Sequence, residues 1–399
     1  MKCTCKRTVT ACFIGYVVQS IVNTFCPLLF VTFSDTYGIP MTRITLLVTI
    51  NFLLQLCIDM VAARVANRIS YRVMAVAAQV FSGVGMILLS VLPDLLPDPF
   101  IGLLLAVMVC AVGGGLLEVI VSPMIEACPL SNKQQMMSLL HSVFCWGQVA
   151  VIALSTLFFS VVGIENWRIL TRLWSIVPFA NAVFFLLVPI YRPEGDGEGG
   201  LSLRKLVKLP AFWLFFAMML CAGASEVSVS QWASAFAERG LGISKTIGDL
   251  AGPMAFAVCM GISRMIFGFF GARLRLERYI LFSSILCIAS YLCIVFAPVP
   301  VLGLIGCAIC GFSVGIFWPG TLSMASGTIP GGGTAMFALM ALAGDIGCSA
   351  GPTLAGMVAG AEGDDLRLGI LAAIVFPVLM LGGGLILLRR MRRFRPSKE

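Results

Sequence analysis

The chain has 399 residues, of which 59% are hydrophobic and only 12% charged, and its mean hydropathy is +1.00. This composition excludes an ordinary soluble domain and indicates an integral membrane protein. The formal net charge of +8 is explained by the basic loops that orient membrane helices, and we expect no binding to nucleic acid.

Apolar stretches of about twenty residues recur along the chain, separated by short polar or Pro/Gly-rich segments, and each is long enough to cross a hydrocarbon layer about 30 Å thick. Because the first stretch is too long for a signal peptide and lacks a cleavage site, we interpret it as a helix. The sequence thus predicts an all-α membrane protein with twelve transmembrane helices, at 9–32, 44–63, 73–92, 100–125, 137–161, 169–190, 209–236, 248–270, 279–297, 301–325, 334–360 and 368–388.

The second half of the chain repeats the first at an offset of about 200 residues. Gly115 and Pro123 are eight residues apart, as are Gly311 and Pro319. A repeat of this length in a membrane protein is typical of secondary transporters, whose binding site lies between the repeats. We therefore expect two pseudo-symmetric six-helix bundles.

The predicted division is an N-terminal bundle at 1–190, a cytoplasmic linker at 191–208 and a C-terminal bundle with a basic cytoplasmic tail at 209–399. Within this linker, the Gly- and Glu-rich stretch from Pro193 to Gly200 cannot form a packed element. Most of the 27 basic residues fall on one side if both termini are cytoplasmic, which is the orientation we expect. We place the protein as a monomer in a bacterial inner membrane, in contact with lipid.

The first span carries Tyr16, Gln19 and Asn23 at helical spacing, so these side chains share one face. Polar groups inside a membrane should face a cavity or another helix. We interpret this face as binding a small polar solute; hydrogen bonding between helices is the structural alternative.

The second span carries Asp59 near its end, followed by Arg64 and Arg68, and Arg264 holds the matching place in the second half. Opposite charges at equivalent places predict gating contacts that break as the bundles rock. We assign Asp59, Arg68 and Arg264 to a gate, with substrate binding as the alternative for Arg264.

The fourth span places Glu118 near its middle, on one face with Gly114 and Ser122. An ionised group there costs about 2.5–3.5 kcal/mol on insertion scales, so it should face water or a partner. A carboxyl group in a partly dry cavity is suited to taking up and releasing a proton, and we predict coupling for Glu118. A packing hydrogen bond is the alternative.

The later spans add four further candidates for substrate binding or coupling. His141, the sole histidine, precedes Cys145 at helical spacing and suggests a proton relay or a structural hydrogen bond. Glu226 and Trp232 supply a carboxylate for hydroxyl pairs and an aromatic plane for the apolar face of a ring. Asp345 adds a carboxylate in the eleventh span.

Other chemistry is not expected. Nearly all of the 15 cysteines lie in apolar spans, so we predict no disulfides, and no Cys/His group has the spacing of metal ligands. No Walker A motif is present, which excludes nucleotide-driven pumping by this chain. We predict no enzymatic activity and no cofactor beyond a coupling ion, H⁺ or Na⁺.

Two loop and helix motifs resemble those of the major facilitator superfamily. The segment from Ala63 to Arg72 is similar to its loop motif G-x-x-x-D-R-x-G-R-R, with Asn67 at the acidic position. Gly261, Arg264 and Gly268 resemble the matching pattern in the second half. With twelve spans and a central linker, the resemblance covers almost the whole chain and implies alternating access.

A narrower resemblance is to the fucose permease and hexose–cation symporter group. The segment from Gly115 to Pro123 is similar to its helix 4 segment G-x-x-E-T-x-x-N-P, which implies that Glu118 serves proton coupling. The segments around His141 and Glu226 resemble its helices 5 and 7. In helix 1, Asn23 stands where the permease has a proton-linked Asp.

The sequence thus favours a secondary active transporter that moves a small polar solute, a sugar or related metabolite, by alternating access and coupled to a cation gradient. One alternative is a proton-coupled exporter of amphipathic or drug-like compounds, since the predicted walls are rich in Met, Phe and Cys. A further alternative is a receptor or scaffold that transports nothing.

Overall fold

A computed structural model of the chain describes residues 3–65, 69–129, 133–191, 203–270, 275–329 and 333–394. Within these ranges the backbone is helical apart from short turns, and none of them contains a strand. Proline at the first turn marks several helix starts, because its missing N–H would be unpaired there in any case. Asp98 caps one of them by accepting a hydrogen bond from the backbone N–H of Phe100 at 3.0 Å.

The first half of the chain forms six long helical segments and three short ones. The long segments are α1 (Cys3–Thr24) continued by η1 (Cys26–Leu29) and α2 (Phe30–Tyr37), α3 (Met41–Val65), α4 (Tyr71–Leu89), α6 (Pro99–Ala127), α7 (Lys133–Val162) and α8 (Trp167–Leu187). The short elements that lie between them or follow are α5 (Leu92–Leu95), η2 (Ile164–Asn166) and α9 (Leu203–Leu206).

The second half follows the same plan. Its segments are α10 (Pro210–Ser230) with α11 (Ala233–Ala235) and η3 (Phe236–Gly240), then α12 (Lys245–Asp249) with η4 (Leu250–Met254) and α13 (Ala255–Phe270), α14 (Leu276–Phe296), α15 (Pro300–Val314) with α16 (Phe317–Thr328), α17 (Gly333–Ala361), and α18 (Leu366–Ala372) with α19 (Val375–Phe394).

Eleven helical stretches in the described ranges are long and apolar enough to cross a membrane, against the twelve predicted. The stretch that does not qualify is α17, whose 29 residues include Asp345 and many glycines. It nevertheless packs lengthwise against α3 and α10, so it runs through the molecule like the others.

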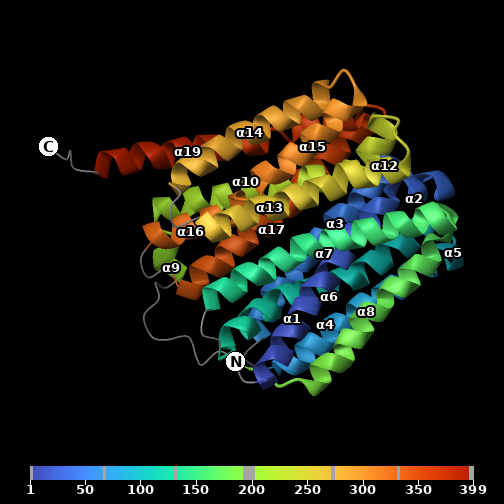
Figure 1. Ribbon diagram of the computed structural model, residues 1–399, viewed down its shortest axis with the longest axis horizontal. Coiled ribbons are helices and arrows are strands. Elements are labelled where there is room, and N and C mark those ends of the chain that lie inside the picture. The colour runs from blue at the N-terminus through green and yellow to red at the C-terminus, as the bar shows by residue number, and fades with distance from the viewer. Residues whose placement is uncertain are drawn as a thin grey trace.

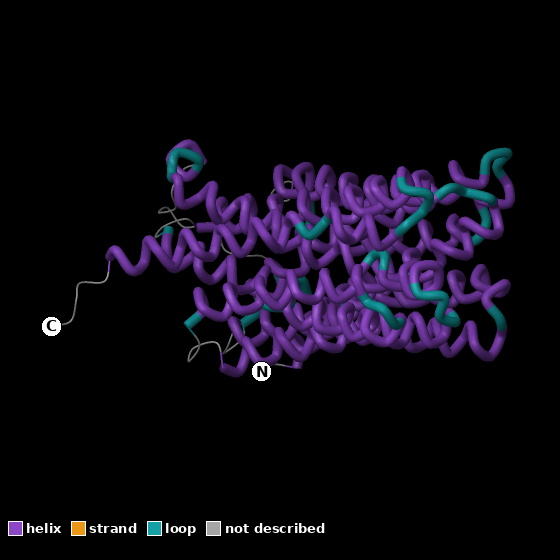
Figure 2. The backbone as a smooth tube through the Cα atoms, turned by 90° about the horizontal axis from the view of Figure 1, so that it is seen from above, coloured by secondary structure: helices purple, strands orange, loops and turns teal. Residues whose placement is uncertain are grey.

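The two halves lie side by side as elongated bundles, with α1 to α8 in blue and green and α10 to α19 in yellow to red (Figure 1). Both chain termini lie at the same end, which we call the terminal end; the end with α2, α5 and α12 is the far end (Figure 1). Seen from above, the helices remain roughly parallel along the long axis (Figure 2).

The interface between the bundles has the same pseudo-symmetry as the sequence. It is formed mainly by α3 packed against α17 and by α7 packed against α13. Shifting α3 and α7 by about 200 residues gives α13 and α17, so each contact is the repeat equivalent of the other. Such an interface allows one bundle to rock against the other around a central site.

Glycines set the close approach of α10 and α17 inside the second bundle. A Cβ added to Gly347 would lie 2.0 Å from the carbonyl oxygen of Leu220, and one added to Gly223 would lie 2.2 Å from that of Gly344. No side chain fits at those distances. The glycines therefore allow backbone-to-backbone packing, as small residues do between membrane helices.

We expect Gly347→Ala to lower the thermal unfolding temperature of the detergent-purified protein, because α17 must move away from α10 at a typical overpacking cost of about 1–3 kcal/mol. Gly382→Ala in α19 is the matched control, since no atom lies within 4 Å of its added Cβ. Equal unfolding temperatures for the two variants would show that the α10 and α17 contact tolerates a methyl group.

Candidate functional site

Charged and polar side chains from six long helices meet between the bundles, and we call this group the central cluster. It comprises Tyr16 from α1, Glu118 and Ser122 from α6, His141 and Cys145 from α7, Glu226 from α10, Arg264 from α13, and Asp345 and Cys348 from α17. These residues come from both halves of the repeat. A ligand bound here would therefore contact both bundles.

Arg264 joins the two bundles within the cluster. Its Nη2 donates to Oε2 of Glu226 at 3.1 Å, and its Nη1 donates to Sγ of Cys145, across the interface, at 3.3 Å. The buried Nε has no acceptor. Both members of the ion pair have side chains that are 14% exposed.

Arg264 has a partner in the second bundle that the sequence did not predict. Because α13 runs from the far end toward the terminal end, and side chains lean toward the start of their helix, the long Arg264 side chain reaches back toward the centre. There it pairs with Glu226. Arg68 and the side chain of Asp59 lie outside the described part of the structure, so their gating role stays a prediction.

Glu118 is the carboxylate of the cluster without a described partner. Its side chain is half-buried and forms no hydrogen bond or ion pair with the residues that the structure describes. Glu118, Glu226 and Asp345 all lie close enough for their charges to act on the thiol of Cys348. Three carboxylates therefore share the neighbourhood of one guanidinium, and Glu118 is the one available to exchange a proton.

Tyr16 and His141 form the first-bundle wall of the cluster. The Tyr16 hydroxyl lies 3.2 Å from Oγ of Ser122, and its ring packs edge-on against the His141 ring with centroids 5.6 Å apart. His141 is exposed. The sulfur of Cys145 is 3.9 Å from the backbone carbonyl of His141. The proton relay considered for His141 stays a prediction.

A chain of amides continues from the cluster toward the far end. Nε2 of Gln19 donates to Gln55 at 3.2 Å, Nε2 of Gln55 donates to Oδ1 of Asn23 at 3.0 Å, and Gln231 of the second bundle donates to the Asn23 carbonyl at 3.1 Å. Two small cavities flank Asn23 and Gln231, each with about 20 Å³ of room for water. Of the amides predicted in helix 1, Asn23 therefore lies at the interface between the bundles, whereas Gln19 bonds to Gln55 within the first bundle.

Gln55 and Gln231 were not singled out from the sequence. The available signal was their amide side chains inside or beside apolar spans, where polar groups need partners. That signal does not say which of several polar residues on a helix lies at the interface, because the orientation of each helix depends on how all twelve segments pack.

Trp232 contributes to packing in this conformation. Its indole is fully buried, donates from Nε1 to the Pro352 carbonyl at 3.0 Å, and lies 5.4 Å from the Phe30 ring of the first bundle. It is not among the residues that line either cavity beside Asn23. Its predicted contact with a substrate ring would require a conformation other than the present one.

A buried ionic group, not predicted from the sequence, closes the interface toward the far end. Nζ of Lys245 lies 3.1 Å from carboxylate oxygens of Glu238 and Asp249, and also donates to the Leu28 carbonyl of the first bundle. The Asp249 side chain is completely buried and accepts from Thr156 of the first bundle at 3.4 Å. We call Lys245, Glu238 and Asp249 the far-end lock.

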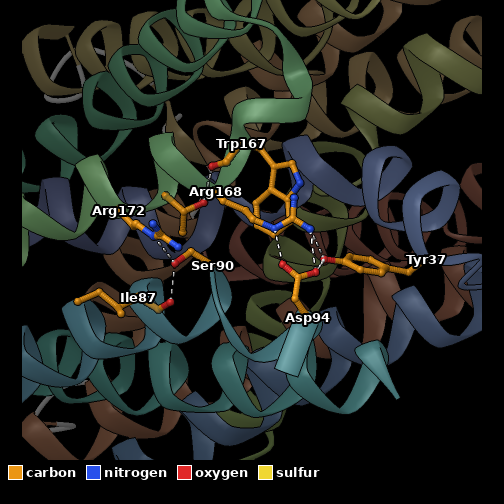
Figure 3. Close-up of polar contacts among 8 residues, drawn as sticks. Tyr37, Ile87, Ser90, Asp94, Trp167, Arg168 and Arg172 are labelled. Atoms are coloured by element: carbon orange, nitrogen blue, oxygen red, sulfur yellow. Dashed lines mark hydrogen bonds and ion pairs between the residues drawn. The ribbon is translucent and has the colours of Figure 1, made fainter. Parts of the chain in front are cut away.

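Further ion pairs support this end. Arg239 pairs with Asp35 across the bundles at 2.5 Å. Within the first bundle, Arg168 binds Asp94 through two nitrogens and also donates to Tyr37 (Figure 3). The hydrogen bond from Arg168 holds the pKa of Asp94 below its usual value. These contacts fix the helix ends that carry the interface.

The bonds between bundles are distributed unevenly along the long axis. In the described ranges they run from the Arg239 and Lys245 contacts at the far end to the Arg264–Cys145 contact at the centre. Nearer the terminal end, no hydrogen bond or ion pair between the bundles is described. The molecule is thus closed at the far end, and the exposed His141 lies on the terminal side of the central cluster.

A protein family and several solved structures share this fold. The family model described as Major Facilitator Superfamily matches residues 10–352. Two crystal structures of a bacterial homolog of the human lysosomal transporter Spinster, inward-facing and either occupied or unoccupied, superpose with TM-scores of 0.80 and 0.79, at 15% and 16% identity and over 100% of both chains. The E. coli fucose:proton symporter superposes with a TM-score of 0.63 at 14% identity, over 95% of this chain and 97% of the symporter. Among curated proteins, none matches the sequence significantly.

Proposed function

This chain belongs to the major facilitator superfamily and is a multi-pass secondary transporter, not an enzyme, and we propose that it moves a small polar solute, a sugar or related metabolite, together with a coupling cation. Support comes from the central cluster, where hydroxyl, imidazole and carboxylate groups of both bundles converge at the rocking interface. Such groups pair with the hydroxyls of a polar solute.

The observation that carries the coupling part of the proposal is the unpaired Glu118. A carboxylate without a cationic partner in a partly dry site is stabilised when it binds a proton. The fraction of Glu118 that is protonated can therefore follow a proton gradient. The far end is closed by Lys245, and among the described residues nearer the terminal end no bond between the bundles is present, so we propose that the structure is inward-facing. Both termini would then be cytoplasmic, in a bacterial inner membrane.

The test is a thermal-shift screen of the purified protein against hexoses, organic acids and lipophilic cations, at two pH values and with or without Na⁺, followed by uptake into liposomes. Stabilisation by polar solutes and their uptake against a proton gradient is the expected result. If only lipophilic cations stabilise the protein, or no solute is carried, the proposal is wrong.

One observation supports the alternative function, which is proton-coupled export of amphipathic compounds. The cavity beside Asn23 is walled mainly by apolar side chains, including Val22, Phe30 and Met86. Walls of this kind accept amphipathic compounds, because flexible thioether and aromatic groups adapt to different shapes. The lipophilic cations in the screen address this second candidate.

A further inference from the structure

The hydrogen-bonding capacity of Arg264 is largely unused. A guanidinium carries five N–H donors in a planar fork, which matches both oxygens of one carboxylate. Here it meets Glu226 through one nitrogen and one oxygen, and its second contact is a thiol, a weak acceptor. The buried Nε has no acceptor at all. A ligand carboxylate that displaces Glu226 could therefore form a bidentate contact that Glu226 does not form.

The position of Arg264 is also suited to a substrate contact. It extends from α13 of the second bundle to Cys145 of α7 in the first, and its charge acts on Tyr16 and His141 across the interface. Hydroxyl and imidazole groups therefore lie on one side of the guanidinium and a displaceable carboxylate, Glu226, lies on the other. A ligand held here would contact both rocking halves.

We infer that the solute carries a carboxylate, which replaces Glu226 as the partner of Arg264, while the hydroxyls of the solute bind the wall formed by Tyr16, Ser122 and His141. This inference rests on the proposed function and narrows its substrate class to sugar acids, such as hexuronates. Glu226 acts as an internal stand-in for the substrate carboxylate when the site is empty.

The charge balance of the cluster limits the ligand to one negative charge. Arg264 is the one arginine or lysine among the described residues of the central cluster, and it is surrounded by the carboxylates Glu118, Glu226 and Asp345. A dianion such as a sugar phosphate would add more repulsion than one guanidinium offsets. A monoanionic carboxylate replaces the charge of Glu226 one for one when the displaced Glu226 takes up a proton, so it is the ligand that the fork and the charges fit.

The test compares matched ligands that differ only at C6: galactose with galacturonate, and glucose with glucuronate, with galactose 6-phosphate as the dianion. Dissociation constants are measured on the intact purified protein. Because the charge-assisted fork is formed only by the acid, each uronate should bind at least about ten-fold more tightly than its sugar. Galactose 6-phosphate should gain nothing over galactose.

Three variants assign the preference to Arg264. The double variant R264Q/E226Q replaces both members of the buried pair by neutral amides, so neither is left as a lone charge, and its uronate-to-sugar preference should fall below about two-fold. E226Q alone removes the internal competitor and should tighten uronate binding. Arg264→Lys keeps the charge but not the planar fork, and should give an intermediate preference for the uronate over the sugar. This variant tests the role of Arg264 even if the double variant does not fold.

The outcomes separate the inference from the proposed function. Transport of neutral hexoses without a uronate preference, a preference that survives in R264Q/E226Q, or tighter binding of the phosphate would overturn the inference while the transporter remains. If no hexose or uronate binds or is carried, the proposed function itself fails.

Discussion

Substituting Glu118 by Gln should abolish accumulation of solute against its gradient while leaving exchange of solute across the membrane. Glu118 has no described partner, so the neutral amide imitates its protonated form without leaving an unpaired charge behind. If the protonated acid is what permits the bundles to reorient, the variant reorients freely and no longer responds to the proton gradient. Its solute binding should also lose its dependence on pH.

The measurement uses liposomes with and without an imposed proton gradient, and compares net uptake with counterflow exchange. Glu165→Gln is the control, because it makes the same chemical change at an exposed position outside the central cluster. A Glu118→Gln protein that still concentrates solute would move the coupling role to Glu226 or Asp345. Loss of binding altogether would make Glu118 a direct ligand of the solute.

Removing the cation of the far-end lock should open the far end. In Lys245→Met, the carboxylates of Glu238 and Asp249 remain buried with no ammonium beside them. Breaking a buried ion pair in this way costs about 3–5 kcal/mol in the state that buries it. Opening the interface exposes both carboxylates to water and avoids that cost. Relative to the unchanged protein, the variant should therefore favour the conformation with an open far end by at least about ten-fold. This holds even if one of the two carboxyl groups becomes protonated.

Cys26 is a native reporter of this change, because it lines a cavity of the first bundle that Gln231 of the second bundle borders. Its modification by a membrane-impermeant maleimide, followed by peptide mass spectrometry, should be at least ten-fold faster in Lys245→Met than in the unchanged protein. Arg43→Gln is the control, since its pair with Asp98 is exposed on both sides and such pairs contribute about 0–1 kcal/mol. Equal rates for both variants would mean that apolar packing, and not the lock, closes the far end.

The sequence by itself determined the fold class, because a bilayer leaves few choices. Apolar runs of about twenty residues must be helices, since backbone groups have no other partners in hydrocarbon. The repeat and its motifs then indicated the superfamily that the match over residues 10–352 shows. These are properties of composition and spacing along the chain, and they need no knowledge of which helices are neighbours.

The pairing of side chains was decided only by the tertiary structure. Asp59 and Arg264 hold equivalent sequence positions, yet Arg264 bonds to Glu226, because a long side chain on a tilted helix can reach more than one neighbour. The far-end lock was equally hidden, since Glu238, Lys245 and Asp249 come together where two helices turn at one end of the bundle. A charge in a span predicts that a partner exists, whereas the identity of that partner depends on how the bundles pack and which end is closed.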